Sequence, residues 1–179
     1  IKAADCELYT YSEKGKEADF SASDIRYVSQ PDFVGTEFHI SGKYDMEVRL
    51  GIPGLFNVVN ALAAVSVCSC LDLDKEKISH ALEHIRVNGR MEIVYTSERC
   101  TVLVDYAHNA VSMESLLSTL RDYKPKRLVC VFGCGGNRSK DRRYSMGEIG
   151  GKLADLSIIT ADNSRYEKVE DIIADIRGS

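Results

Sequence analysis

The sequence contains no tryptophan, only 3 prolines and no pair of cysteines at CxxC spacing among its 179 residues. No apolar run approaches the ~20 residues that a membrane-spanning helix needs, so we expect no membrane insertion. The formal net charge of −4 provides no basic surface, so nucleic-acid binding is not expected either. A GxxxxGK[ST] pattern is also missing, which excludes a P-loop from this stretch of chain.

The composition is that of an ordinary globular protein, with 44% apolar and 28% charged residues. The 6 cysteines lie mostly in apolar runs, without the spacing of a metal site. We therefore predict reduced thiols, a cytoplasmic location and no bound metal. The first residue is isoleucine and the chain opens as if inside a domain, so we expect a piece of a longer protein.

The first half of the chain predicts strands followed by helices. Residues 1–50 alternate polar and apolar side chains and are rich in β-forming residues, which indicates antiparallel strands. Pro53 opens a helix over residues 54–71 that is apolar nearly all round, so we expect it to be buried. A second, amphipathic helix is expected over residues 74–85. The polar joint at residues 87–90 is the predicted domain boundary.

Strands and helices alternate in the second half. Such alternation is typical of βαβ units, which form parallel sheets with right-handed crossovers. We predict an α/β fold, in which the β-rich end of one domain (residues 1–87) is followed by a Rossmann-like, mostly parallel domain (residues 88–179). The predicted strands read MEIVYT, TVLVDY, RLVCVF and LSIIT, and the predicted helices span residues 112–123, 145–154 and 169–177.

The last three predicted strands each end in polar residues. Asp105 and His108 follow the first of them. The glycine-rich stretch FGCGGN, residues 132–137, ends the second and is followed by Arg138, and Asn163 and Arg165 follow the third. Because the carboxyl ends of parallel strands meet at one edge of a sheet, we predict that these residues share one ligand-binding rim.

The glycine-rich stretch has two interpretations. It does not match the dinucleotide pattern GxGxxG, because Arg138 stands where the last glycine is needed. It is either a backbone cradle for an anion or a tight turn that passes close to a neighbouring segment. Lys140, Arg142 and Arg143 follow at once, and these cations suit either an anionic ligand or a solvated loop.

Further polar residues have both a structural and a functional interpretation. Asn57 and Asn60 share one helix face, where they either tie down the helix start or pair with adenine. Asp105 is suited to accept hydrogen bonds from a ribose. Asp162 could cap the helix that follows it, whereas Arg165 could bind a carboxylate through two parallel hydrogen bonds.

A short zinc-peptidase pattern, H-x-x-E-H, occurs at His80, Glu83 and His84. These side chains lie off the apolar stripe of their helix, on the face expected to contact solvent. No third metal ligand can be identified, so we predict no metal site there.

Taken together, the motifs resemble those of the Mur ligase family, most closely its UDP-N-acetylmuramoyl-tripeptide synthetase (MurE) type. Five stretches occur in the family's order and approximate spacing: PGLFNVVNALAA, VNGRMEIV, VDYAHNA, FGCGGNRSKDRRYSMG and TADNSR. The resemblance implies a monomeric, cytoplasmic, ATP- and Mg²⁺-dependent ligase of peptidoglycan biosynthesis, and so a role in the cell wall, cell shape and cell division. Such ligases convert the substrate carboxylate to an acyl phosphate, which the amine of an incoming amino acid attacks.

The resemblance also implies which parts are present. Residues 1–87 would be the end of the central ATPase domain, and residues 88–179 most of the C-terminal domain. The family's P-loop and carbamylated lysine would lie upstream, so we expect no catalytic residue here and no activity from these 179 residues alone.

The same resemblance assigns two groups of binding residues. Asn57 and Asn60 would lie beside adenine, Arg90 would be a hinge arginine that reaches ATP, and Asp105 would bind ribose. The complete ATP-side group is Asn57, Asn60, Arg90, Asp105 and His108. The amino-acid-side group is Arg143, Asp162, Asn163, Ser164 and Arg165.

The amino acid that this group would bind is a diamino acid, for which meso-diaminopimelate is the first hypothesis. Its distal carboxylate would pair with Arg165, which would repel the ammonium group of lysine. Ser164 stands where diaminopimelate-adding members usually have proline. The other substrate would be UDP-N-acetylmuramoyl-L-alanyl-D-glutamate. The alternatives are a lysine-adding or divergent Mur-like ligase and a non-catalytic nucleotide-binding module.

Overall fold

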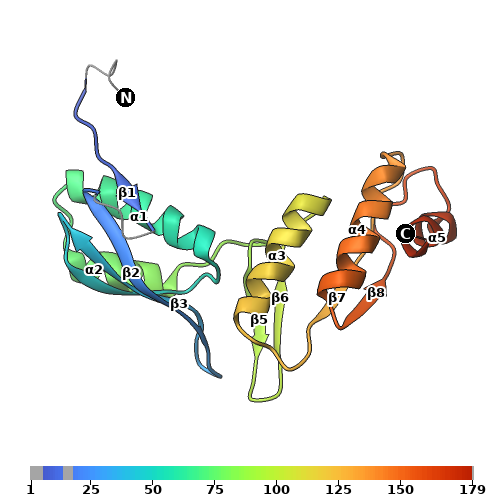
Figure 1. Ribbon diagram of the computed structural model, residues 1–179, viewed down its shortest axis with the longest axis horizontal. Coiled ribbons are helices and arrows are strands. Elements are labelled where there is room, and N and C mark those ends of the chain that lie inside the picture. The colour runs from blue at the N-terminus through green and yellow to red at the C-terminus, as the bar shows by residue number, and fades with distance from the viewer. Residues whose placement is uncertain (1–5, 14–17, 179) are drawn as a thin grey trace. The chain divides into compact units, whose positions relative to one another are not determined.

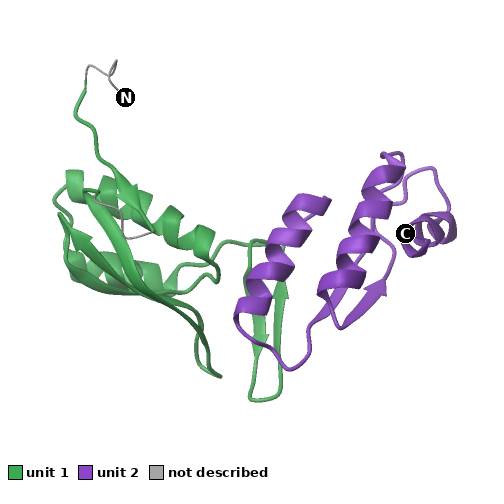
Figure 2. Cartoon of the chain, viewed as in Figure 1, with its two compact units in different colours: residues 1–105 green, residues 106–179 purple. Residues whose placement is uncertain are grey.

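The structure, a computed structural model, describes residues 6–13 and 18–178 (Figure 1). The chain forms two compact units, residues 1–105 and residues 106–179 (Figure 2). In the described parts of the chain, no helix is both long and apolar enough to cross a membrane. All six cysteines are free thiols. The domain boundary expected at residues 87–88 stays a prediction.

A four-stranded sheet in the order β1-β2-β3-β4 opens the first unit. Its strands are β1 (Tyr11–Ser12), β2 (Phe20–Ser29), β3 (Val34–Gly42) and β4 (Met46–Leu50). β2, β3 and β4 are antiparallel, as predicted for this region, whereas β1 pairs with β2 in parallel. Phe20, Phe38 and Ile40 are fully buried, and their neighbours along each strand point away from the core.

Two helices follow, α1 (Leu55–Cys70) and α2 (Lys75–His84). α1 contributes Val58, Leu62 and Val65 to the core that it shares with the sheet. Its opposite side is open, with Val67 62% exposed, so the prediction that α1 is buried is right for one face only. A helix that packs on a single layer covers only one of its faces, whatever the composition of the other.

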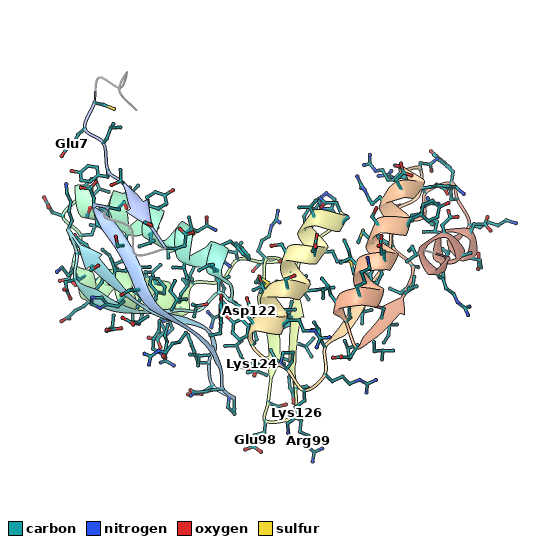
Figure 3. All side chains as sticks on the ribbon, viewed as in Figure 1. Glu7, Glu98, Arg99, Asp122, Lys124 and Lys126 are labelled. Carbon is teal, nitrogen blue, oxygen red and sulfur yellow. The ribbon has the colours of Figure 1, made fainter. Side chains whose placement is uncertain are left out.

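The hairpin of β5 (Glu92–Thr96) and β6 (Thr101–Val104) ends the first unit. Figure 3 shows Glu98 and Arg99 at the tip of this hairpin. In the part of the chain that the structure describes, β6 pairs only with β5, in antiparallel orientation. A short turn between two strands gives such an antiparallel pair, and a parallel pairing of β6 with the strands of the second unit stays a prediction.

The second unit consists of three helices and a parallel strand pair. Its elements are α3 (Ala110–Asp122), β7 (Val129–Phe132), α4 (Lys140–Leu153), β8 (Leu156–Ile159) and α5 (Val169–Arg177). β7 and β8 are parallel neighbours, which confirms a strand–helix–strand unit around α4. The mixed α/β fold class is thus confirmed.

The core of the second unit lies between the helices and one face of β7 and β8. Met113, Met146 and Ile176 are buried there, and Phe132 packs against them. The other face of the strand pair carries Val131, which is 62% exposed. The prediction that β7 is a buried strand is therefore right for one face only.

Candidate functional site

Two loops meet where β7 and β8 end: the glycine loop, residues 133–139, and the DNSR loop, residues 160–168. The Gly136 backbone N–H donates to the carbonyl of Asn163 at 2.8 Å, and the Gly136 carbonyl accepts from Nη1 of Arg165 at 2.9 Å. A Cβ atom on Gly136 would lie 1.9 Å from the Ser164 carbonyl oxygen. Gly136 is therefore required because the DNSR backbone passes against it.

Asn137 continues this contact between the two loops. Its side-chain oxygen accepts from the backbone N–H of Tyr166 at 3.3 Å, and its own backbone N–H donates to the carboxylate of Glu167. Asn137 and Arg165 have φ values of 52° and 50°, in the left-handed backbone region that residues other than glycine rarely adopt. The hydrogen bonds between the loops thus hold both residues in an unfavourable backbone conformation.

Arg143, from α4, lies beneath the two loops and is 1% exposed. Its Nη2 donates to Glu167 and its Nη1 to Asp175, each at 2.8 Å. Lys140 adds a second, exposed cation at 3.2 Å from Asp175. Both terminal nitrogens of the guanidinium are thus occupied by carboxylates of the chain itself. Direct contact of Arg143 with an amino acid stays a prediction.

Charge pairing shifts the acid–base properties of this cluster. The Arg143 guanidinium, followed by the Asn137 N–H, lowers the pKa of Glu167 below its ordinary 4.5. Arg143 likewise lowers the pKa of Asp175 below its ordinary 3.8. The two carboxylates, Glu167 first, raise the pKa of Arg143, which remains a cation at any working pH.

The second unit is expected to lose stability in acid. Because the pKa values of Glu167 and Asp175 are lower in the folded chain, their stabilisation is present above the unfolded pKa values and is lost as pH falls through the folded ones. The NMR signals of folded α5 should hold their intensity from pH 7 to 5 and decline below the ordinary Glu value of 4.5. The double variant Glu167→Gln/Asp175→Asn should decline less steeply; an unchanged acid profile would contradict this assignment.

Substituting Gly136 with alanine is expected to force the two loops apart. The new methyl group would meet backbone, which cannot move aside as a flexible side chain would. We expect a loss of about 2 kcal/mol in the stability of the second unit, measured by amide hydrogen exchange in α5. Gly135→Ala is the matched control, since its Cβ would meet nothing nearer than 3.6 Å. Equal effects of the two substitutions would contradict the close approach at Gly136.

The remaining cations of this region lie at the start of α4 and before it. Arg138 and Lys140 are exposed and Arg142 is half-buried. Arg142 lines an open cleft of about 730 Å³ between the first turns of α3 and α4. The other residues that line this cleft are Asn109, Ala110, Val111, Ser112, Ser115, Asp141 and Ser145.

Asn57 and Asn60 form a pair at the start of α1. The Asn57 amide donates to the carbonyl of Pro53 at 2.7 Å, and the Asn60 amide donates to the Asn57 side-chain oxygen at 3.2 Å. Asn57 is half-buried and Asn60 is exposed. The structural interpretation, that Asn57 ties down the helix start, is thus correct. The Asn60 amide is exposed and is oriented by its hydrogen bond to Asn57. Adenine binding by this pair stays a prediction.

Arg90 and Asp105 are connected through one backbone group. The half-buried carboxylate of Asp105 accepts from the N–H of Met91, the residue after Arg90, at 2.8 Å. The Glu92 carboxylate accepts from the N–H of Gly89 at 2.7 Å. Two acidic side chains thus fix the backbone on either side of Arg90. Ribose binding by Asp105 and ATP binding by Arg90 stay predictions.

His108 lies at the start of the second unit, just before α3. Its ring is exposed, and its centroid lies 5.0 Å from the centroid of the Tyr106 ring. Nδ1 of His108 lies 3.1 Å from the Tyr106 carbonyl oxygen. Asn109 caps α3 by accepting from the N–H of Ser112 at 3.0 Å. The cap explains why Asn109 precedes this helix, and a nucleotide role for His108 stays a prediction.

The structure brings together residues of the predicted amino-acid-side group. Asn163, Ser164 and Arg165 share the DNSR loop, and Arg143 reaches that loop through Glu167. Asp162 lies in the same loop but does not cap α5, whose N-cap is Lys168. Asp105 follows β6, which pairs with β5 in the first unit, whereas the two loops follow β7 and β8 in the second unit, so a single rim that includes Asp105 and His108 stays a prediction.

Glu167 and Asp175 were missed by the sequence interpretation. Asp175 stands beside Ile176 and three residues after Ile172, on the stripe that α5 buries. An acid beside an apolar stripe indicates a buried partner, so this signal was available. For Glu167, the only signal in the sequence was its position two residues after Arg165.

The zinc-peptidase pattern in α2 has structural partners. Glu83 accepts from Nη1 of Arg49 at 2.7 Å, and Nδ1 of His84 lies 2.8 Å from the His80 carbonyl. In the described ranges, no group of three or more His, Cys, Asp or Glu side chains could hold a metal ion. Glu83 therefore stabilises the packing of α2 on the sheet.

Comparison with known proteins gives a consistent result across the chain. The Mur ligase middle domain matches residues 1–68, and the Mur ligase glutamate ligase domain matches residues 89–179. The UDP-N-acetylmuramoyl-L-alanyl-D-glutamate–2,6-diaminopimelate ligase of Alkaliphilus oremlandii is 41% identical over 175 residues, which are 97% of this chain and 35% of that protein. The second such ligase of Clostridium acetobutylicum is also 41% identical, over 98% of this chain and 36% of its own length.

A solved structure of a UDP-N-acetylmuramoyl-L-alanyl-D-glutamate–2,6-diaminopimelate ligase matches with a TM-score of 0.69 and 30% identity. The match covers 94% of this chain and 34% of the solved one. The chain thus spans about a third of the length of the relatives that it matches. The two domain matches, to residues 1–68 and 89–179, show that the chain belongs to the Mur ligase family.

Proposed function

We propose that this chain is part of an ATP-dependent ligase that adds meso-diaminopimelate to UDP-N-acetylmuramoyl-L-alanyl-D-glutamate in peptidoglycan synthesis. The supporting relatives bear that activity in their names and align with nearly all of the chain. Residues 1–87 would complete a central domain and residues 88–179 would form most of a C-terminal domain. The ligase would act as a monomer in the cytoplasm.

ATP, with Mg²⁺, would supply the phosphoryl group that activates the substrate carboxylate. The groups in this chain suit the nucleoside part of that ligand. Asn60 is a surface amide oriented by Asn57, which fits the amino group and ring nitrogen of adenine. The half-buried carboxylate of Asp105 fits a ribose hydroxyl. Arg90, next to the anchored Met91, and the exposed imidazole of His108 would complete this side.

The observation that carries the amino-acid side is the hydrogen-bonded contact between the glycine loop and the DNSR loop. Across this contact, Nη1 of Arg165 donates to the Gly136 carbonyl, and within the DNSR loop the Arg165 backbone N–H donates to the side-chain oxygen of Asn163. Arg165 is exposed, and within the described residues its other guanidinium nitrogens have no hydrogen-bond partner. A carboxylate could therefore accept two parallel hydrogen bonds from it. Asp162, Asn163 and Ser164 would supply polar contacts to the amine and carboxylate of the ligand.

Diaminopimelate fits this arginine better than lysine does. Both molecules carry the reacting amine, but only diaminopimelate has a distal carboxylate to pair with a guanidinium. Lysine would bring an ammonium group toward the Arg165 cation, which is repulsive. A lysine-adding ligase of the same family is therefore the second candidate, and a nucleotide-binding module without catalysis is the third.

The test is a panel of amino acids assayed with the complete ligase that contains this chain, with ATP and UDP-N-acetylmuramoyl-L-alanyl-D-glutamate. We expect phosphate release and product formation with diaminopimelate at a kcat/KM at least about tenfold above that with lysine, since a pocket built for a charged group discriminates strongly. The 179-residue chain alone should release no phosphate. Preference for lysine would favour the second candidate, and nucleotide binding without phosphate release in the complete protein would favour the third.

A further inference from the structure

Glu167 occupies a central position between the loops and α4, and the proposed reaction gives it no role. Its Oε1 atom accepts from Nη2 of Arg143 at 2.8 Å and from the backbone N–H of Asn137. Its own backbone N–H donates to the Ser164 carbonyl at 3.0 Å. One carboxylate oxygen thus joins three segments: the glycine loop, the DNSR loop and α4.

The residue whose conformation these contacts restrain is Arg165. Its backbone is left-handed, a conformation that persists in a residue other than glycine only where the surroundings enforce it. Ser164 before it is tied to Glu167, and Tyr166 after it donates to Asn137. The direction of the Arg165 side chain therefore depends on the hydrogen bonds that Glu167 and Asn137 make.

We propose that Glu167 is a positioning residue for amino-acid selection, which acts by holding the DNSR loop against the glycine loop so that Arg165 points at the distal carboxylate of the incoming amino acid. The proposal rests on the proposed function, because it gives Arg165 the ligand named there. Arg143, in α4, supports this position of Glu167. It is fixed by Asp175 at one nitrogen and holds Glu167 with the other.

A competing role for Glu167 follows from the same contacts. The Glu167 carboxylate could pair with Arg143 in place of a carboxylate of the ligand. The ligand would then displace Glu167 from Arg143 on binding. Burial argues against this, because Arg143 is 1% exposed and a ligand would have to open the packing around it. The two roles predict opposite changes in KM for the amino acid. Loss of a positioning carboxylate weakens binding of the amino acid, and loss of a competitor strengthens it.

The experiment measures KM and kcat of the complete ligase for diaminopimelate, ATP and the UDP-sugar dipeptide. Glu167→Gln is expected to raise KM for diaminopimelate about tenfold, the scale of a lost charged hydrogen bond, and to leave KM for the other two substrates unchanged. In an Arg165→Ala background the same substitution should change KM less than about twofold, since positioning a side chain that is absent has no effect. Glu170→Gln, at an exposed carboxylate of α5, is the matched control.

A second variant guards against misfolding of the first. Asn137→Gly removes the acceptor for the Tyr166 N–H, while glycine adopts the required φ of 52° without strain. It should raise KM for diaminopimelate in the same direction and again lose its effect in the Arg165→Ala background. Additive effects in that background, or equal increases in all three KM values, would mean a merely structural role and overturn the proposal.

The outcomes separate this inference from the function on which it rests. If the unsubstituted ligase shows no diaminopimelate-dependent phosphate release, the proposed function fails. If that activity is present and depends on Arg165, but Glu167→Gln keeps the unsubstituted KM, only the positioning role fails. A lower KM in Glu167→Gln would overturn positioning in favour of competition for Arg143.

Discussion

Replacing Arg165 with alanine is expected to lower kcat/KM for diaminopimelate by about 30-fold or more in the complete ligase. This corresponds to about 2 kcal/mol, the contribution of a hydrogen-bonded charge pair that is lost from one side. The reason is geometric as well as electrostatic. The side chain is held by the Gly136 carbonyl at one nitrogen, so the rest of its guanidinium is preorganised for a carboxylate.

The same variant should discriminate less between amino acids. Without the guanidinium, the attraction for a distal carboxylate and the repulsion of an ammonium group disappear together, so kcat/KM for lysine should hold steady or rise. Arg177→Ala, which removes an exposed arginine from the end of α5, is the matched control and should change neither value. An unchanged kcat/KM for diaminopimelate in Arg165→Ala would reject Arg165 as the group that binds it.

Local patterns predicted most elements around this loop, although α4 begins at Lys140, five residues before its predicted start. The bounds expected for α5, residues 169–177, are those of the structure, because its apolar stripe and polar first turn are both clear. The glycine-rich stretch was expected at a strand end and lies there. Its tight-turn interpretation is correct, since Gly136 lets the DNSR backbone pass. These features depend on residues close together in sequence, which is why the sequence could predict them.

Features that depend on distant residues were not predictable in the same way. Lys140 and Arg143 looked like a solvated or ligand-binding basic cluster, yet Arg143 is buried between acids 24 and 32 residues away. Likewise, the run of apolar residues in β7 could not reveal that one face of the strand is open. Composition reports how apolar an element is, but which side becomes covered depends on the elements packed against it.

The two groups of candidate residues therefore rest on different kinds of support. On the amino-acid side, hydrogen bonds within one compact unit connect the DNSR loop, the glycine loop and α4. On the ATP side, Asn57 with Asn60 and Arg90 with Asp105 form two local arrangements in the first unit, and His108 lies in the second. That these residues bind one nucleotide stays a prediction.

The largest loss of stability is expected from Arg143→Met, which removes the cation but keeps the apolar part of the side chain. Glu167 and Asp175, which are 31% and 18% exposed, would be left facing each other's charge without a counterion. Removing one partner of a buried ion pair typically costs 3–5 kcal/mol, and partial exposure of the carboxylates argues for about 3 kcal/mol here. The measurement is the free energy of opening from amide hydrogen exchange in α5.

Two further variants decide whether charge is the cause. Lys140→Met removes a cation from the same cluster, but its side chain is 63% exposed, so we expect a loss below about 1 kcal/mol. Combining Arg143→Met with Glu167→Gln and Asp175→Asn should recover much of the loss, because the two carboxylates no longer carry charge and Lys140 is exposed to solvent. A triple variant as unstable as Arg143→Met alone would instead mean that Arg143 stabilises α4 and α5 by packing, and that its ion pairs serve mainly to hold the loop that carries Arg165.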